Sequence, residues 1–141
     1  MNKKTISRIL SILIMSSIFW FSHQDGRETM NQSTYVKNQI EKAIGKRLSV
    51  NIRKNAHFFI YLGLGSGLLF CREKKGAKEI VQTAIFILLY AIGDEYHQSF
   101  IPGREAKLRD IGIDFLGGVS GIMVVKSLFY IKNMNLYDEN T

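Results

Sequence analysis

Four long apolar windows are the dominant pattern along the chain. They span residues 6–22, 56–71, 79–93 and 111–131, and they contain only four charged side chains: Arg8, Glu79, Asp114 and Lys126. Each window is apolar on every face rather than along one stripe, and a helix of that kind must lie in a large core or in lipid. With roughly 20 apolar residues needed to cross a bilayer, the pattern predicts four transmembrane helices.

The expected architecture is an all-α, polytopic membrane protein with four transmembrane helices in a compact bundle. It forms one domain, residues 1–141, with helices at about 6–22, 56–71, 79–95 and 111–131, an outer loop at 23–55, an inner loop at 72–78 and an outer turn at 96–110. A soluble helical core is the alternative, but a chain of this size buries too little surface to hide such helices. A cleaved signal peptide is the alternative for the first window, although no small-x-small cleavage site follows it.

The distribution of charge predicts the orientation. The chain has 19 basic and 12 acidic residues, and its lysines and arginines are dense at residues 72–78 and before the first window. Short segments rich in Lys and Arg stay in the cytoplasm, so we expect both termini inside. The same segregation of charge argues against a nucleic-acid-binding surface. The single cysteine excludes a disulfide framework and a cysteine-based zinc site.

Glycines at helical spacing predict where the helices touch. In lipid, helices associate by close packing, and small residues four apart mark the contact faces. The candidates are Gly63 and Gly67, with Gly65 between them, in the second window, and Gly117, Gly118 and Gly121 in the fourth. We interpret both groups as helix-packing positions.

Polar side chains gather at the predicted outer ends of the helices. Arg53, His57 and Tyr61 are spaced i, i+4, i+8 and therefore share one helix face. Asp114 lies on the glycine face, where an acid must be paired, so we expect it to face a basic side chain rather than lipid. Its candidate partners are Arg53, Arg104 and His57. The full set of candidate binding residues is Ser22, Gln24, Arg53, His57, Tyr61, Asp94, Glu95, His97, Gln98, Arg104, Asp110 and Asp114.

These residue types allow more than one chemistry. Asp94 or Glu95 with His57 could act as an acid–base pair, and these three are the catalytic candidates. Arg104 can hold a phosphate or carboxylate through two parallel hydrogen bonds. Asp94, Glu95, His97 and His57 are also metal-ligand types, but their spacing selects no metal. We therefore assign no metal and no cofactor from the sequence.

Taken together, the motifs resemble those of the VanZ-like family. The matching segments, in chain order, are Phe21-Ser22-x-Gln24, Arg53-Lys54-x-Ala56-His57-Phe58 with Tyr61, Tyr90-Ala91-x-x-Asp94-Glu95-x-His97-Gln98, Phe100-x-Pro102-Gly103-Arg104, Asp110-x-x-x-Asp114 and Gly117-Gly118-x-x-Gly121. His23 is a departure, since relatives often have a small residue there. The ordered set covers residues 20–121 and is far more specific than any one motif.

The resemblance implies a small multi-pass protein of the bacterial cytoplasmic membrane. The family takes its name from a protein linked to low-level resistance to the lipoglycopeptide teicoplanin. We therefore expect a non-enzymatic protein that binds a lipid-linked or amphiphilic envelope molecule at its outer face and lowers susceptibility to teicoplanin-like glycopeptides. Expected partners are membrane lipid and a lipid-linked cell-wall precursor or lipoglycopeptide, and not nucleic acid. The alternatives are an intramembrane enzyme acting on a lipid-linked envelope precursor through a Glu/Asp–His pair, and a structural partner of another membrane protein.

Overall fold

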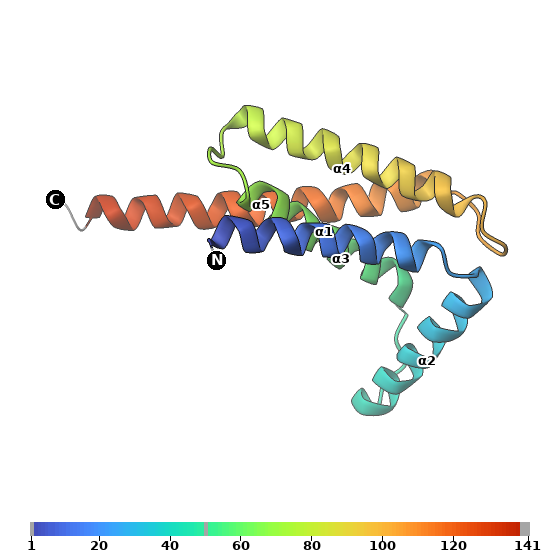
Figure 1. Ribbon diagram of the computed structural model, residues 1–141. Helices are drawn as coiled ribbons and strands as arrows, with labels where there is room; N and C mark the ends of the chain where they lie inside the picture. Colours follow the sequence, from blue (N-terminus) through green and yellow to red (C-terminus); the bar gives the residue numbers. More distant parts are fainter. Residues whose placement is uncertain (1, 50, 139–141) are drawn as a thin grey trace.

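The described part of the chain is built of five α-helices. The computed structural model describes residues 2–49 and 51–138, which form α1 (Lys3–Ser22), α2 (Gly26–Ile44), α3 (Ile52–Phe70), α4 (Ala77–Gln98) and α5 (Leu108–Asp138) and contain no strand. The helices α1, α3, α4 and α5 run side by side, whereas α2 leaves one end of the bundle at an angle (Figure 1). The all-α prediction is confirmed. Residues 1 and 139–141, the termini that the charge pattern assigns to the cytoplasm, lie outside the described residues.

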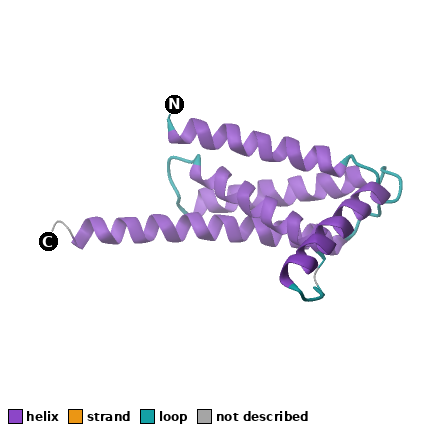
Figure 2. Cartoon of the chain, turned by 90° about the horizontal axis from the view of Figure 1, so that it is seen from below, coloured by secondary structure: helices purple, strands orange, loops and turns teal. Residues whose placement is uncertain are grey.

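The four bundle helices overlap the four apolar windows but have different ends. α3 begins at Ile52 rather than at residue 56, because the Asn51 side chain caps it by accepting a hydrogen bond from the Lys54 backbone N–H at 3.2 Å. α5 has 31 residues and continues past the predicted end at residue 131. At 1.5 Å per residue it is about 46 Å long, and its C-terminal part projects beyond the other helices (Figure 2).

The segment 23–55 is not simply the loop that the apolar pattern predicted, because α2 occupies much of it. The Asp25 carboxylate caps the start of α2 by accepting a hydrogen bond from the Arg27 backbone N–H at 2.7 Å. Gly45 ends the helix in the left-handed conformation, with φ of 70°. Since α2 is amphipathic and polar on average, a search for apolar windows does not detect it.

The exterior of the bundle is apolar. Among the described residues, two helices are long and apolar enough to cross a membrane, Lys3–Ser22 and Leu108–Met134 within α5. Large side chains such as Trp20, Leu89 and Leu128 are 70%, 63% and 61% exposed. Apolar surface of this extent is uncommon on a soluble monomer, and it agrees with a membrane location. The number of spans stays a prediction.

The closest helix contact joins α3 to α5. These two helices make the most extensive contact of the bundle, and small residues allow their backbones to approach. A side chain on Gly65 of α3 would overlap the backbone of Gly118, and one on Gly121 of α5 would overlap the carbonyl of Leu62. Gly117 likewise faces the Phe58 carbonyl. The glycines of the fourth apolar window therefore lie at a helix interface.

The other two glycines of α3 have different surroundings. Gly67 faces α1, where the Ser7 hydroxyl donates a hydrogen bond to the Gly67 carbonyl at 3.0 Å. At Gly63 an added Cβ would stand 3.6 Å from the Ile14 side chain, which is ordinary contact. Gly63 is thus not a close-packing position, although its four-residue spacing from Gly67 predicted one. The spacing identifies a shared face, but not which neighbour covers each part of it.

Candidate functional site

The candidate site lies at the end of the bundle where α1 and α4 end and where α3 and α5 begin. Gln98 is at its centre and is fully buried. The Gln98 amide nitrogen donates to the Ser22 hydroxyl at 3.1 Å and to the Asp94 carboxylate at 3.0 Å. Its amide oxygen accepts a hydrogen bond from the Arg53 guanidinium at 3.1 Å. One side chain therefore connects α1, α3 and α4.

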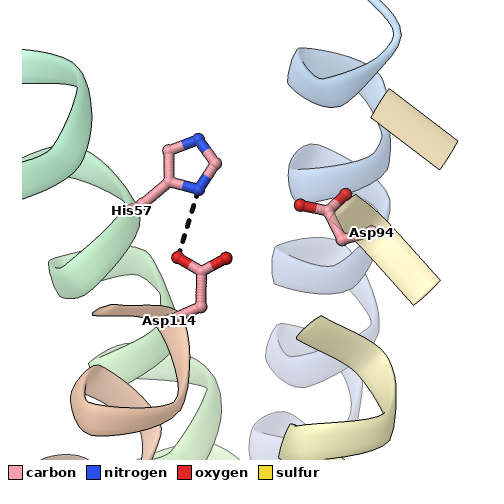
Figure 3. Close-up of side chains that lie close together, drawn as sticks. All are labelled: His57, Asp94 and Asp114. Carbon is pink, nitrogen blue, oxygen red and sulfur yellow. Dashed lines mark hydrogen bonds and ion pairs between the residues drawn. The ribbon is translucent and has the colours of Figure 1, made fainter. Parts of the chain in front are cut away.

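A histidine–aspartate pair lies beside this network. His57 of α3 places Nδ1 3.2 Å from Oδ1 of Asp114 of α5, and Asp114 is fully buried (Figure 3). The prediction that Asp114 faces a basic partner rather than lipid is confirmed, with His57 as the partner. Asp94 of α4 faces the pair, and one ligand atom from each of the three side chains lies within 4.8 Å of the other two. In the described part of the chain, these three residues are the group that could hold a metal ion.

A small pocket opens at this end of the bundle. The space inside it that a water molecule can occupy is only about 10 Å³, and its lining consists of Arg53, Lys54, His57, Glu95, Asp110, Ile113 and Asp114. Lys54 and Asp110 form an ion pair of 2.8 Å within this lining. Pockets that enclose whole small-molecule ligands have volumes of roughly 300–1,000 Å³. The pocket is therefore suited to a small polar group or an ion rather than to a whole amphiphile.

Glu95 is held inside this pocket and not in open solvent. It is 2% exposed, and its carboxylate accepts a hydrogen bond from the Lys107 backbone N–H at 2.9 Å. This bond fixes the end of α4 to the residue that precedes α5. Glu95 and His57 consequently line the same cavity.

Arg104 does not line the pocket. It is 8% exposed, and its Nη2 donates to the Phe21 carbonyl at 2.7 Å and to the Thr29 hydroxyl at 2.8 Å. Burial lowers the pKa of the Arg104 guanidinium, and the nearby charge of Arg53 lowers it further. Both acceptors are neutral, so these bonds are not ion pairs. Because Phe21 lies at the end of α1 and Thr29 lies on α2, Arg104 connects the corner between these helices to the loop between α4 and α5.

The turn before Arg104 makes the same connection. The Pro102 carbonyl accepts a hydrogen bond from the Gly26 backbone N–H at 3.0 Å. Gly103 has a φ of 73°, which favours glycine. A side chain on Gly26 would overlap the Gly103 carbonyl, so both glycines are needed for the loop to reach α2.

His97 points away from the site. Its ring stacks on Phe19 with ring centres 4.8 Å apart and on His23 at 5.4 Å, and its Nε2 lies 3.3 Å from Nδ1 of His23. The sequence makes both His97 and Gln98 candidates for the site, but only Gln98 contacts Asp94. The structure selects Gln98. The metal-ligand set considered from the sequence, which included Glu95 and His97, is thus replaced by one that includes Asp114.

Three more side chains lie around the site: Tyr61 and Gln24, which the sequence predicted, and Thr29, which it did not. Tyr61 is fully buried, and its hydroxyl has no hydrogen-bond partner among the described residues. Gln24 is half-buried, and its amide oxygen likewise has no partner there. Thr29, which accepts from Arg104, was missed because it lies on α2. The local sequence signals for that helix are its caps, Asp25 and Gly45, together with its amphipathic pattern.

These features define an all-α protein with a buried polar cluster at one end of an apolar bundle. The chain matches the model of the VanZ/LLP1 family over residues 8–130, and it belongs to this family. The matched region contains every residue of the candidate site. Comparison with curated proteins and with solved structures finds no match. The family and the two apolar helices together suggest a membrane protein.

Proposed function

We propose that the chain is a VanZ-like membrane protein that binds the charged headgroup of a lipid-linked or amphiphilic envelope molecule. The observation that carries this proposal is the polar pocket at one end of an otherwise apolar bundle. The charged end of the headgroup contacts the mouth of the pocket, while the hydrocarbon part stays against the helices. In the proposed topology, with four transmembrane helices and both termini in the cytoplasm, the pocket faces the outside of the bacterial membrane.

Within the pocket, Arg53 is the side chain suited to an anionic group. Lys54 is already paired with Asp110, whereas Arg53 has no acidic partner in the described part of the chain. A guanidinium can hold a phosphate or a carboxylate through two parallel hydrogen bonds. Glu95 and Asp114 lie in the same lining and suit a cationic group. A headgroup that carries both signs of charge therefore fits best.

Binding is tested with a minimal anionic amphiphile. The full-length protein in lipid nanodiscs is titrated with fluorescent farnesyl diphosphate, and farnesol serves as the uncharged comparison. A hydrogen bond to a charged group contributes about 1.5–3 kcal/mol, so Arg53→Gln should weaken binding at least about tenfold. Arg109→Gln, which removes an exposed arginine at the same end, should leave it unchanged. Equal affinities of Arg53→Gln and wild type would show that the pocket is not the binding site.

Drug susceptibility is tested separately. A teicoplanin-susceptible bacterium is given the wild-type chain, Arg53→Gln or an empty vector, and the inhibitory concentration of teicoplanin is measured. The wild type should raise it, and Arg53→Gln should not. A glycopeptide without an acyl chain should be unaffected. If the wild type has no effect on teicoplanin, the resistance part of the proposal is wrong.

One observation favours a second function, an intramembrane enzyme that acts on a lipid-linked envelope precursor. His57 is oriented by the buried Asp114 and shares a cavity with Glu95, and a histidine held by an acid is a common arrangement for a general base. Phosphate release from farnesyl diphosphate should then occur with the wild type and be lost in His57→Gln. Release no faster than in buffer would reject this function.

A further inference from the structure

Three metal-ligand side chains from three different helices meet below the pocket. His57, Asp94 and Asp114 come from α3, α4 and α5, and one ligand atom from each lies within 4.8 Å of the others. Figure 3 shows the Asp94 and Asp114 carboxylates facing each other across the space between their helices, with the His57 ring above Asp114. Asp94 is 6% exposed and Asp114 is fully buried. The group therefore lies inside the bundle rather than on its surface.

One carboxylate oxygen in this group has no partner. Oδ1 of Asp114 interacts with His57, but the buried Oδ2 has no hydrogen bond in the described part of the chain. Figure 3 shows this oxygen turned toward the side of Asp94. The hydroxyl of Tyr61, two turns further along α3 from Arg53 and one from His57, is also buried and unpartnered. Buried polar atoms nearly always have a partner, so an unpaired carboxylate oxygen at this place indicates a missing ligand.

The charges of the cluster are also unbalanced. Neither Asp94 nor Asp114 forms an ion pair with a lysine or arginine among the described residues, since the nearby Lys54 is paired with Asp110. Arg53 donates to Gln98, and Arg104 donates to neutral oxygens. Within the described chain, the only basic group that contacts either carboxylate directly is His57, which carries at most one positive charge. Two buried carboxylates that share one such partner are unfavourable. A divalent cation carries the charge that neutralises both.

We propose that His57, Asp94 and Asp114 bind one divalent transition-metal ion, Zn²⁺ or Mn²⁺. One imidazole and two carboxylates suit either ion, and three protein ligands leave a coordination position for water or for a ligand group. His57 and Asp114 also line the pocket, which gives the ion a route from the end of the bundle. The 3.0 Å hydrogen bond from Gln98 to Oδ2 of Asp94 orients this carboxylate, as outer-shell partners of metal ligands do.

Binding requires a modest contraction of the cluster. Zn–N and Zn–O distances are about 2.0–2.2 Å, which puts neighbouring ligand atoms in a tetrahedral site roughly 3.4 Å apart, against a widest separation of 4.8 Å here. Nδ1 of His57 and Oδ1 of Asp114 are already 3.2 Å apart, so the contraction is mainly a shift of Asp94 toward this pair. The inference goes beyond the proposed headgroup binding, and its test uses no amphiphile.

The test measures metal binding to the full-length protein in lipid nanodiscs. The protein is stripped with chelator and titrated with ZnCl₂ or MnCl₂ by calorimetry, and bound metal is counted by mass spectrometry after gel filtration. We expect one ion per chain for the wild type. His57→Gln, Asp94→Asn and Asp114→Asn should each weaken binding at least about tenfold. Wild-type protein that binds neither ion would overturn the proposal.

Two matched controls separate this site from its neighbours. Glu105→Gln removes an exposed carboxylate at the same end of the bundle, and His97→Gln breaks the exposed histidine pair with His23, which could capture zinc by itself. Both variants should bind like the wild type. Loss of binding in His97→Gln with retention in His57→Gln would place the metal at the exposed pair and overturn the proposal.

X-ray absorption of the wild type loaded with zinc keeps the proposal testable if the cluster variants do not fold. The spectrum should show nitrogen and oxygen neighbours near 2.0 Å with the scattering of a single imidazole. Scattering from two imidazoles would contradict the assignment.

Discussion

Gly65→Ala should destabilise the protein by forcing α3 and α5 apart. The added Cβ would overlap the backbone oxygen of Gly118. A backbone atom in a packed helix cannot rotate away as the end of a flexible side chain can. The two helices must therefore separate over their whole contact, which is the most extensive one in the bundle.

The expected size follows from a comparison within the same helix. Gly63→Ala adds the same methyl group two residues earlier, where its nearest neighbour is the Ile14 side chain at 3.6 Å. Both variants gain about 1 kcal/mol from the higher helix propensity of alanine, so this contribution cancels in the difference. Overpacking typically costs about 1–3 kcal/mol. Gly65→Ala should therefore be less stable than Gly63→Ala by about that amount, with Gly63→Ala as stable as wild type or more so.

The assay is reversible unfolding in mixed micelles with increasing sodium dodecyl sulfate, followed by circular dichroism. The wild type and the two variants are measured under the same conditions, and the free energies of unfolding are compared. If Gly65→Ala is as stable as Gly63→Ala, the close approach of Gly65 to Gly118 is wrong, and the packing derived from it must be rejected.

Three further changes probe the polar end of the bundle and α2. Gln98→Leu removes the partner of Arg53 and Asp94 and should lower the free energy of unfolding by about 2–4 kcal/mol; a neutral result in the same assay would show that the network contributes nothing. Asp25→Ala removes the cap of α2 and should weaken that helix by about 1 kcal/mol, seen as faster amide hydrogen exchange in α2 alone; unchanged exchange would contradict this. A double-mutant cycle of Lys54→Met and Asp110→Asn should give a coupling of no more than about 1 kcal/mol, because both side chains are partly exposed. A coupling of several kcal/mol would mean that the pair is shielded from solvent.

The sequence predicted the helical class and the end of the bundle where the polar residues meet, because both depend on patterns within one helix. The spacing of Arg53 and His57 fixes a common face whatever the neighbouring helices do. The partner of Asp114 needed the structure, since three basic side chains were equally open from the sequence. His57 was selected by the way α3 and α5 pack through Gly65 and Gly118.

The sequence did not reveal α2 and did not separate His97 from Gln98, and each of these errors has a physical cause. α2 escaped notice because its polar average conceals an amphipathic pattern, although Asp25 and Gly45 are ordinary start and stop signals. His97 and Gln98 were both placed in the site, because they are three and four residues from Asp94. The helix rotation favours Gln98, which is four residues away, and turns His97 toward Phe19. Residues three and four positions after Asp94 both lie near the same helix face, so spacing alone does not show which of them points into the site.

The contact between α3 and α5 also has a consequence for how the chain is made. His57 and its partner Asp114 are 57 residues apart in the sequence. Ribosomes add roughly 5–20 residues per second, so about 3–11 s pass between the synthesis of His57 and that of Asp114. During this interval α1 is already available to Gly67, but Gly65 and His57 lack their neighbours on α5. The last of the described helices therefore supplies the partner of His57, and a ribosome that stalls before Asp114 leaves a product without this pair.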